Sequence, residues 1–411
     1  MLIKKDKLNL YFFLALLSLW QMQIFGSNTR IIVSVCCGGI VLLNILSTGH
    51  VAKNPAKVLM PLILIVIIGS FSALWQNSDI PLHNYFRDMY YILPVCFMYY
   101  HGFLLSLKYS KKEIGSTIVW ANVIATIDHF AKVLSKIHYI SNLDYLRNEC
   151  GAISFLNTIA IVLVLFGNDY ISDRIKKNRR LFVLFFAISE ILYFSRTGIV
   201  SLIIFVTVVY LMKLKSLVIR LIKFLSILVV CGLVVYFANP SIVDAFVEKI
   251  DYTLIELGME KNYTTTTDDM MFRQREMVQV VKEFKEGSVL NKAIGYGIGH
   301  NVKLGSNGYK ILIDGEEFTD VGMIHNGYYK ALSIAGVIGL ALFLLFHVNI
   351  LITAWKHRNY MTDVDLRLIL STVVVLLVIT YTVIGIYAKG SNYPYIVALT
   401  LFIYGKKNLE E

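Results

Sequence analysis

The chain alternates between long apolar stretches and short polar ones along almost its whole length. The apolar stretches approach the roughly 20 residues that a helix needs to cross a bilayer, and they lack the alternation of membrane β-strands. About twelve can be placed, at residues 8–25, 31–48, 58–75, 85–105, 114–134, 152–168, 181–195, 197–212, 219–237, 326–350, 367–388 and 391–405. The pattern predicts an all-α polytopic membrane protein with about 12 transmembrane helices.

Composition agrees with this prediction. The 411 residues are 56% hydrophobic and 16% charged, whereas a soluble protein of this size has roughly 25% charged residues. The five cysteines lie mostly in apolar runs and show neither a disulfide framework nor the spacing of zinc ligands. No metal site is therefore expected.

Lysine and arginine concentrate in alternate connections between the spans. These basic connections contain Lys53 and Lys57; Lys108, Lys111 and Lys112; Arg174, Lys176, Lys177, Arg179 and Arg180; Lys213, Lys215, Arg220 and Lys223; Lys356 and Arg358; and Lys406 and Lys407. By the positive-inside rule they are cytoplasmic, which puts both termini inside and the longest polar segment on the outer, periplasmic face. Because that segment carries slightly more acidic than basic residues, nucleic-acid binding does not explain the net charge of +11.

The N-terminus and one apolar stretch near mid-chain need separate treatment. The basic N-terminus is followed by an apolar run without a small-residue cleavage site, which predicts a first span rather than a removed signal peptide. About 32 mostly apolar residues separate Arg180 from Lys213, and one helix of that length would measure about 48 Å against a hydrocarbon core of about 30 Å. We therefore expect a hairpin turning at Ser195-Arg196-Thr197-Gly198 on the outer side. The alternative is one tilted helix with Arg196 at the bilayer centre.

The longest polar segment, residues 238–325, divides the chain into three parts. Residues 1–237 are expected to form transmembrane helices one to nine. Residues 326–411 are expected to form helices ten to twelve and a short cytoplasmic tail. The large loop between them is expected to contain amphipathic helices and the functional elements, held at the outer membrane face.

Arginines and one histidine gather on the predicted outer face. They are Arg147 before the sixth span, Arg196 at the hairpin turn, Arg273 and Arg275 in the large loop, and His325 where the tenth span begins. The planar guanidinium fork suits phosphate oxygens, so such a set at headgroup level indicates a phosphate or pyrophosphate on a lipid. Ordinary headgroup anchoring is the alternative.

Other ionisable residues lie inside or beside spans, where they usually face the protein interior or a cavity. Arg87 and Asp88 open the fourth span on the outer side, and they either line the site or pair with each other. For Glu190 and His347 a structural hydrogen-bonding role is as strong an interpretation as a functional one.

Residues 272–286 predict an amphipathic helix within the large loop. Its apolar residues gather on one side at about 100° per residue, namely Phe272, Met277, Val280, Val281 and Phe284. Arg273 points into this apolar arc and would need a buried partner, which a ligand pyrophosphate would supply. Arg275 lies about 200° away on the polar side and is expected to be solvated. Asp268-Asp269 is expected to cap the helix.

A short glycine-rich stretch, Gly295-Tyr296-Gly297-Ile298-Gly299, follows that helix. Alternating glycines allow tight turns and close backbone approach. No strand–helix unit surrounds them, so they do not form a dinucleotide fingerprint. His300 is expected to be an ordinary solvated loop histidine, whereas His325 is fixed in position by the span behind it.

In their order along the chain, these residues resemble the O-antigen ligase and Wzy polymerase superfamily of bacterial envelope glycan assembly. The matching elements are Arg147 before a span containing Asn157, the Ser-Arg-Thr-Gly turn, the arginine that opens the loop helix, the Gly-x-Gly, and His325-Asn326-Gly327-Tyr328 followed by Ala-Gly-Val-Ile-Gly. The resemblance covers about residues 147–340. The chain departs from it at Met277, where many members carry an aromatic residue, and by lacking a proline before Gly295.

The resemblance implies a GT-C-like, metal-independent inverting glycosyltransferase that acts on undecaprenyl-diphosphate-linked glycans at the outer face of the bacterial inner membrane. It implies that Arg147, Arg196 and Arg273 hold the donor pyrophosphate, and that His325 is the general base or orients the acceptor hydroxyl. The catalytic candidates are His325, Arg196 and Arg273, and the substrate-binding candidates are Arg147, Arg275, Arg87, Asn326, Tyr328, Gly295 and Gly297. The expected partners are an undecaprenyl-diphosphate-linked oligosaccharide, membrane lipid and, as a candidate, a chain-length regulator protein, with no cofactor.

Several functions remain open at this point. The first is a polymerase that transfers a growing chain onto a new lipid-linked repeat unit, and the second is a ligase that transfers the finished chain to lipid A-core. A lipid-linked repeat-unit flippase fits less well, because it should show two similar halves and no large outer loop. Nothing specific in the sequence supports a non-enzymatic sensor.

Overall fold

The computed structural model describes residues 7–26, 28–76, 80–139, 145, 149–151, 154–193, 195–211, 272–303, 311–313, 316–318, 320–322, 324–383 and 392–405. Within these residues the chain is predominantly helical. The helices are α1 (Leu8–Met22), α2 (Asn28–Thr48), α3 (Lys53–Gln76), α4 (Leu82–Lys108), α5 (Lys111–Ser135), α7 (Phe155–Phe166), α8 (Asp173–Lys177), α9 (Arg179–Leu192), α10 (Arg196–Leu211), α13 (Phe272–Glu286), α14 (Val289–Ile294), α15 (Gly327–Lys356), α16 (Asp363–Val383) and α17 (Tyr393–Tyr404).

The predicted membrane spans coincide with helices. Every predicted span carries a helix except residues 219–237, which lie outside the described residues. Of the described helices, α2, α3, α4, α5, α15 and most of α16 are long and apolar enough to cross a membrane, and α1, α7, α10 and α17 are shorter and apolar. The chain is therefore a polytopic membrane protein, as predicted.

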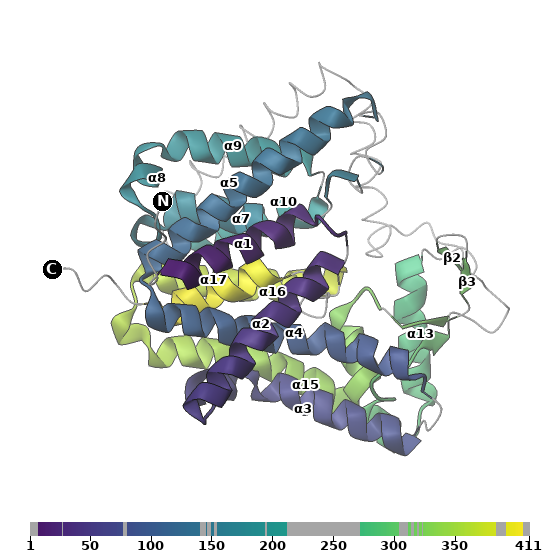
Figure 1. The fold of residues 1–411 in the computed structure, drawn as a ribbon. Coiled ribbons are helices and arrows are strands. Elements are labelled where there is room, and N and C mark those ends of the chain that lie inside the picture. Colours follow the sequence, from purple (N-terminus) through teal and green to yellow (C-terminus); the bar gives the residue numbers. More distant parts are fainter. Residues whose placement is uncertain are drawn as a thin grey trace.

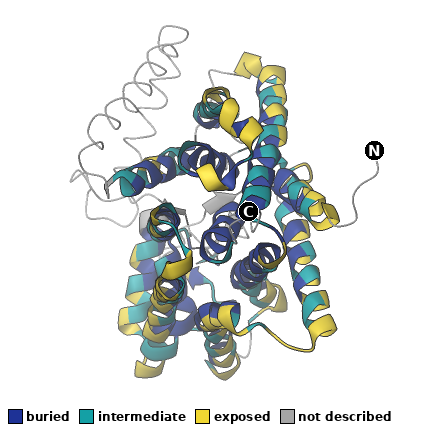
Figure 2. Cartoon of the chain, turned by 90° about the vertical axis from the view of Figure 1, so that its left-hand side faces the viewer, coloured by how far each residue is buried: buried dark blue, intermediate teal, exposed yellow. Residues whose placement is uncertain are grey.

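Among the described residues, the two shortest apolar helices that could contribute to the membrane bundle lie at its centre. Helices α7 and α17 have 12 residues each, and nearly all of their side chains are buried. Such a helix is only about 18 Å long, which is shorter than the hydrocarbon core. Because its side chains are buried, the surrounding helices shield it from lipid. Large apolar side chains on α2 and α3 are instead exposed, as expected for residues that face lipid. Figure 2 shows that exposed residues lie mainly on the outer helices of the bundle.

The hairpin predicted between Arg180 and Lys213 is confirmed as two helices. Helix α9 ends at Leu192 and α10 begins at Arg196, and both pack on α7. The break excludes the alternative of one continuous tilted helix. Arg196 is thus the first residue of a helix rather than a residue in the middle of one.

Segments predicted to be cytoplasmic meet at one end of the bundle. Lys111 Nζ lies 2.5 Å from Asp365 Oδ2, and the Tyr170 hydroxyl donates to Asp365 Oδ1 at 2.5 Å. Lys7 Nζ lies 3.4 Å from Glu113 Oε1 at the same end. Helix α1 begins and α17 ends there, whereas α13 lies at the opposite end (Figure 1).

The large loop contains short strands as well as helices, which the sequence analysis did not anticipate. Strand β1 (Val302–Lys303) pairs antiparallel with β4 (Asp320–Val321), and β2 (Ile311–Ile313) pairs antiparallel with β3 (Glu316–Phe318). These strands have only two or three residues each. The β1–β4 pair links the chain after the glycine-rich stretch to the chain just before α15.

Candidate functional site

Helix α13 lies where α15 begins, with its axis running across those of α3 and α15 (Figure 1). Its bounds, Phe272–Glu286, confirm the predicted helix. Its packed face is not the predicted apolar one. Among the side chains of α13 that the structure describes, those of Arg275, Glu276, Gln279 and Val280 are buried, while those of Met277, Val281 and Phe284 are only partly buried. The packed face is therefore mainly polar.

This orientation shows that the expectation of a solvated Arg275 was wrong. The Arg275 residue is only 1% exposed. The prediction failed because it assumed that the apolar face of the helix is the packed one. Polar residues of α13 instead contact polar partners, among them His300 in the loop and His325 at the start of α15. The side chain of Arg273 lies outside the described residues, so its assignment to pyrophosphate remains a prediction.

His325 is held by a carboxylate from α13. Its backbone N–H donates to Glu276 Oε2 at 2.9 Å, and its ring Nδ1 lies 3.0 Å from Oε1 and 3.1 Å from Oε2. The Glu276 side chain is 0% exposed and the His325 side chain 23% exposed. A carboxylate on Nδ1 fixes the tautomer and orientation of an imidazole and stabilises its protonated form. Proton exchange with a substrate would then take place at Nε2.

Hydrogen bonds hold the helix start behind His325 in place, as predicted. Asn326 is the N-cap of α15, and its side-chain oxygen accepts from the backbone N–H groups of Tyr328 at 3.0 Å and Tyr329 at 3.4 Å. The Tyr328 hydroxyl donates to the Leu377 carbonyl of α16 at 2.8 Å. Asn326 and Tyr328 thus have structural partners beside His325, and their binding of substrate remains a prediction.

The glycine-rich stretch makes the predicted tight turns. Gly295, Gly297 and Gly299 have φ values of 75°, 99° and 88°, a region that disfavours other residues. A Cβ on Gly295 would lie 2.5 Å from the Ala335 backbone nitrogen of α15, and one on Gly297 would overlap the Ala73 backbone of α3. The glycines therefore let this stretch pack between α3 and α15, whereas their contact with substrate remains a prediction.

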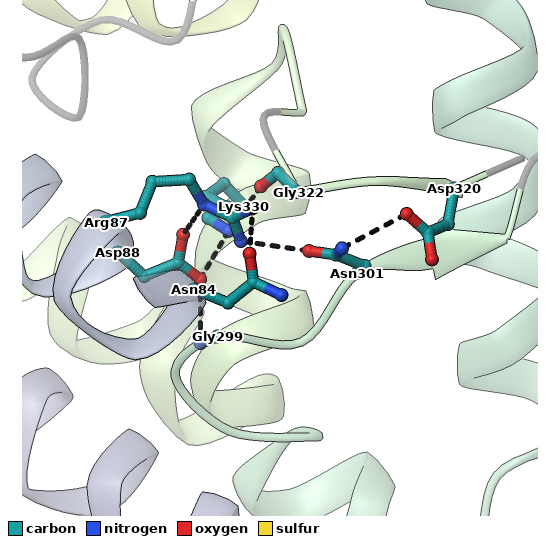
Figure 3. A network of polar contacts seen from close by, with 8 residues as sticks. All are labelled: Asn84, Arg87, Asp88, Gly299, Asn301, Asp320, Gly322 and Lys330. Carbon is teal, nitrogen blue, oxygen red and sulfur yellow. Dashed lines mark hydrogen bonds and ion pairs between the residues drawn. The ribbon is translucent and has the colours of Figure 1, made fainter. Parts of the chain in front are cut away.

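A buried ion network joins this stretch to α4 and α15 (Figure 3). The Asp88 side chain is 0% exposed, and its Oδ2 accepts from Lys330 Nζ at 2.8 Å and from the Gly299 backbone N–H at 2.9 Å. Lys330 Nζ also donates to the Gly322 carbonyl at 2.7 Å. A buried charge is tolerated when it is paired and hydrogen-bonded in this way. The network fixes the first turn of α15, close to His325.

Arg87 belongs to the same network. Its Nε donates to Asp88 Oδ1 at 2.9 Å, its Nη1 to Asn84 Oδ1 at 2.9 Å and its Nη2 to Asn301 Oδ1 at 3.0 Å (Figure 3). Asn301 in turn donates to Asp320 Oδ1 at 3.1 Å. Of the two roles left open by the sequence, the structure shows the pairing with Asp88. These contacts suit a residue that positions the loop, and direct substrate binding by Arg87 remains a prediction.

The expectation of a solvated His300 without fixed neighbours was also wrong. Its Nε2 lies 3.0 Å from Glu283 Oε2 of α13, and its ring stacks on Tyr296 with the centroids 4.7 Å apart. The Tyr296 hydroxyl donates to the Glu283 carbonyl at 2.6 Å. Burial raises the pKa of Tyr296, which keeps this hydroxyl protonated as a donor. His300 thus helps to fix α13 to the glycine-rich stretch.

The turn before Arg196 packs against a buried carboxylate. Glu190 of α9 is 3% exposed and accepts from Ser154 Oγ and Asn157 Nδ2, each at 2.6 Å. A Cβ on Gly198 would overlap both Ser154 and Glu190. The hydrogen-bonding role considered for Glu190 is thus confirmed, and the cluster fixes the first turn of α10, on which Arg196 lies.

Some of the predicted site residues lie outside the part of the chain that the structure describes. Arg147 and the proposed cap Asp268-Asp269 lie outside the described residues. Arg196 belongs to α10, which packs on α7, α9 and α16. The contacts described above bring together His325, its neighbour Asn326 and the packed face of α13.

Glu276 is the functional candidate that the sequence analysis missed. Its partner His325 is 49 positions further along the chain, and nothing in local spacing indicates such a pairing. The available signal was weak: Glu276 lies three positions after Arg273 on the same predicted helix. A glutamate in a loop helix is usually a solvated residue, so this signal alone does not single it out.

One protein-family model matches the part of the chain that contains most of these residues. A family model described as O-antigen ligase, Wzy_C, matches residues 181–344. The match runs from α9 into α15 and includes the Arg196 turn, α13, the glycine-rich stretch and His325. No curated protein matches the chain. The family resemblance predicted from the motifs is confirmed: residues 181–344 form an O-antigen ligase family domain within a polytopic membrane protein.

Proposed function

We propose that this protein is a Wzy-type polysaccharide polymerase. It would transfer a growing glycan from undecaprenyl diphosphate to a lipid-linked repeat unit, at the outer face of the bacterial inner membrane. The family domain supports glycan transfer in envelope polysaccharide assembly. The observation that carries the proposal is the His325–Glu276 pair, because it provides an oriented imidazole at the start of α15.

The pair suits general-base catalysis of glycosyl transfer. In the proposed step the acceptor hydroxyl oxygen attacks the anomeric carbon of the donor sugar, and its proton moves to His325 Nε2. The bond between that carbon and the pyrophosphate oxygen breaks, and undecaprenyl diphosphate leaves with the electron pair. Glu276 stabilises the imidazolium that forms. A single displacement of this kind inverts the anomeric configuration.

Arginines are proposed to neutralise the leaving group. Arg147, Arg196 and Arg273 are the candidates for holding the donor pyrophosphate, and the bidentate guanidinium fork is suited to that charge. Arg275, which lies on the packed face of α13 next to Glu276, is proposed to help bind the substrate. Permanent positive charge supplied by arginines would perform the task that a divalent cation performs in many transferases, so a metal-independent reaction is expected.

Ligation is the second candidate, because the matching family is described as O-antigen ligase. A ligase would use the same donor and the same base but a lipid A-core acceptor. Deletion of the gene distinguishes the two. Loss of a polymerase should leave one repeat unit on the core, whereas loss of a ligase should leave bare core, as resolved by electrophoresis of the extracted glycolipid. A bare core in the deletion strain would refute polymerisation as the function.

The orientation of the protein in the membrane is a further prediction. A reporter fused after His300 is expected to be periplasmic and one fused after Lys177 cytoplasmic, because α8 and α13 lie at opposite ends of the bundle (Figure 1) and the α8 end is basic. Fusions to alkaline phosphatase and to a fluorescent protein at each of these two positions report on which side of the membrane the position lies. A cytoplasmic signal after His300 would contradict the account, since the site would face away from exported substrates.

A further inference from the structure

A groove of about 480 Å³ opens on the surface of the bundle between α3 and α15. The two helices run antiparallel and side by side (Figure 1). The end of α3 contacts the glycine-rich stretch through Ser72 and Gly295, whereas its beginning contacts the later turns of α15 through Lys57 and Asn349. The groove lies along those later turns, away from α13. It is therefore separate from the site around His325.

The groove combines apolar walls with two lysines. Its apolar lining includes Met60, Leu64, Leu345 and Ile352. It is also lined by Lys57, near the start of α3, and by Lys356, the last residue of α15. At 1.5 Å per residue, the stretch of α15 from Leu345 to Lys356 is about 16 Å long. One leaflet of a hydrocarbon core of about 30 Å has about the same depth. The length of the groove thus matches the depth of one leaflet, and its two lysines lie at the basic end of the bundle, where the positive-inside rule places the cytoplasmic headgroups.

A side-chain hydrogen bond fixes the two walls relative to each other. Pro61 has no backbone N–H, so the Lys57 carbonyl lacks its usual helical donor. Asn349 of α15 supplies that donor, with Nδ2 at 3.1 Å from the Lys57 oxygen, and Thr353 Oγ1 donates to the Asn349 carbonyl at 2.7 Å. Because this side-chain contact replaces a main-chain hydrogen bond, it fixes the position of α3 against α15 along the groove.

We infer that this groove binds one anionic phospholipid. The phosphate lies between Lys57 and Lys356, and one acyl chain follows the apolar walls past Met60 and Leu345. A soluble anion would use only the lysines, and a zwitterionic lipid would leave their charge uncompensated. The combination of a long apolar groove with two lysines in its lining therefore favours a lipid with net negative charge.

Native mass spectrometry of the full-length protein in detergent tests this inference, with phosphatidylglycerol and phosphatidylcholine as the probes. The protein should retain one phosphatidylglycerol in preference to phosphatidylcholine. The Lys57→Gln/Lys356→Gln variant should bind phosphatidylglycerol about 25-fold more weakly, since each lysine near a membrane surface contributes about fivefold in affinity for anionic lipid. Met60→Trp should also weaken binding, because it fills the groove and keeps both charges.

Lys53→Gln/Arg358→Gln is the matched control. Both residues are exposed at the same end of the bundle and neither lines the groove, so this variant should bind phosphatidylglycerol like the wild type. Equal losses in the two double variants would show that general surface charge attracts the lipid, and would overturn the inference. Unchanged binding in both Met60→Trp and the second groove-filling variant Ile352→Trp would overturn it as well.

Discussion

Replacing His325 by asparagine is expected to leave a stable, correctly inserted protein whose glycan-forming rate is about 10²–10⁴-fold lower, the usual contribution of general acid–base catalysis. Asparagine cannot accept the acceptor's proton near neutral pH. The cap of α15 should survive the change, because Asn326 and not His325 provides it. Glycan length on cells that carry the variant, normalised to the amount of protein in the membrane, measures the effect.

Glu276→Gln tests whether the carboxylate acts through His325. An amide cannot stabilise the imidazolium, and in a Ser-His-Asp triad the corresponding change costs about 10⁴-fold in kcat. We therefore expect a strong loss of rate. For both variants His83→Asn is the control, because His83 is an exposed histidine at the start of α4. His300 is unsuitable as a control because it contacts Glu283. Wild-type rates in His325→Asn would contradict the assignment of His325 as the base.

Arg275→Ala is expected to reduce both activity and stability. Arg275 is fully buried on the packed face of α13, and truncating a large buried side chain to alanine leaves a cavity at a cost of about 2–5 kcal/mol. Thermal unfolding monitored by fluorescence-detected size exclusion should show a lower melting temperature. Arg275→Lys should recover part of the stability, because it keeps the charge but not the planar fork.

Arg273→Ala provides the comparison on the same helix turn. If Arg273 binds the donor pyrophosphate, its loss should reduce activity without a comparable change in melting temperature. A large drop in melting temperature for Arg273→Ala, with none for Arg275→Ala, would show that the packing of α13 described here is wrong. Retained activity in Arg273→Ala would remove Arg273 from the candidate site.

The arrangement of spans could be predicted because it depends on local properties. Continuous apolar runs specify membrane helices, and basic connections specify which ends of those helices share a membrane face. The length argument for residues 181–212 gave two helices, and the structure shows the break between α9 and α10. Likewise, the glycine pattern 295–299 predicted close backbone approach, which the structure shows against α3 and α15.

The packed face of α13 could not be predicted by the same means. A hydrophobic arc identifies the buried face only when the neighbours of a helix are apolar. Here the neighbours include His325 and His300, whose contacts with Glu276 and Glu283 join positions 49 and 17 residues apart in sequence. The fixed position of His325 could be predicted because it directly precedes a span. Its partner Glu276 could be identified only from the folded structure.

The central claim is that the protein forms glycosidic bonds with His325 as the base, and purified protein in lipid nanodiscs with a defined undecaprenyl-diphosphate-linked repeat unit tests it most directly. The account predicts that the wild type converts this single substrate into lipid-linked dimers and longer oligomers while releasing undecaprenyl diphosphate, as followed by mass spectrometry. His325→Asn should form the same products at least about 10²-fold more slowly, and His83→Asn at the wild-type rate. Absence of oligomers with the folded wild-type protein, or equal rates for the wild type and His325→Asn, would contradict the account.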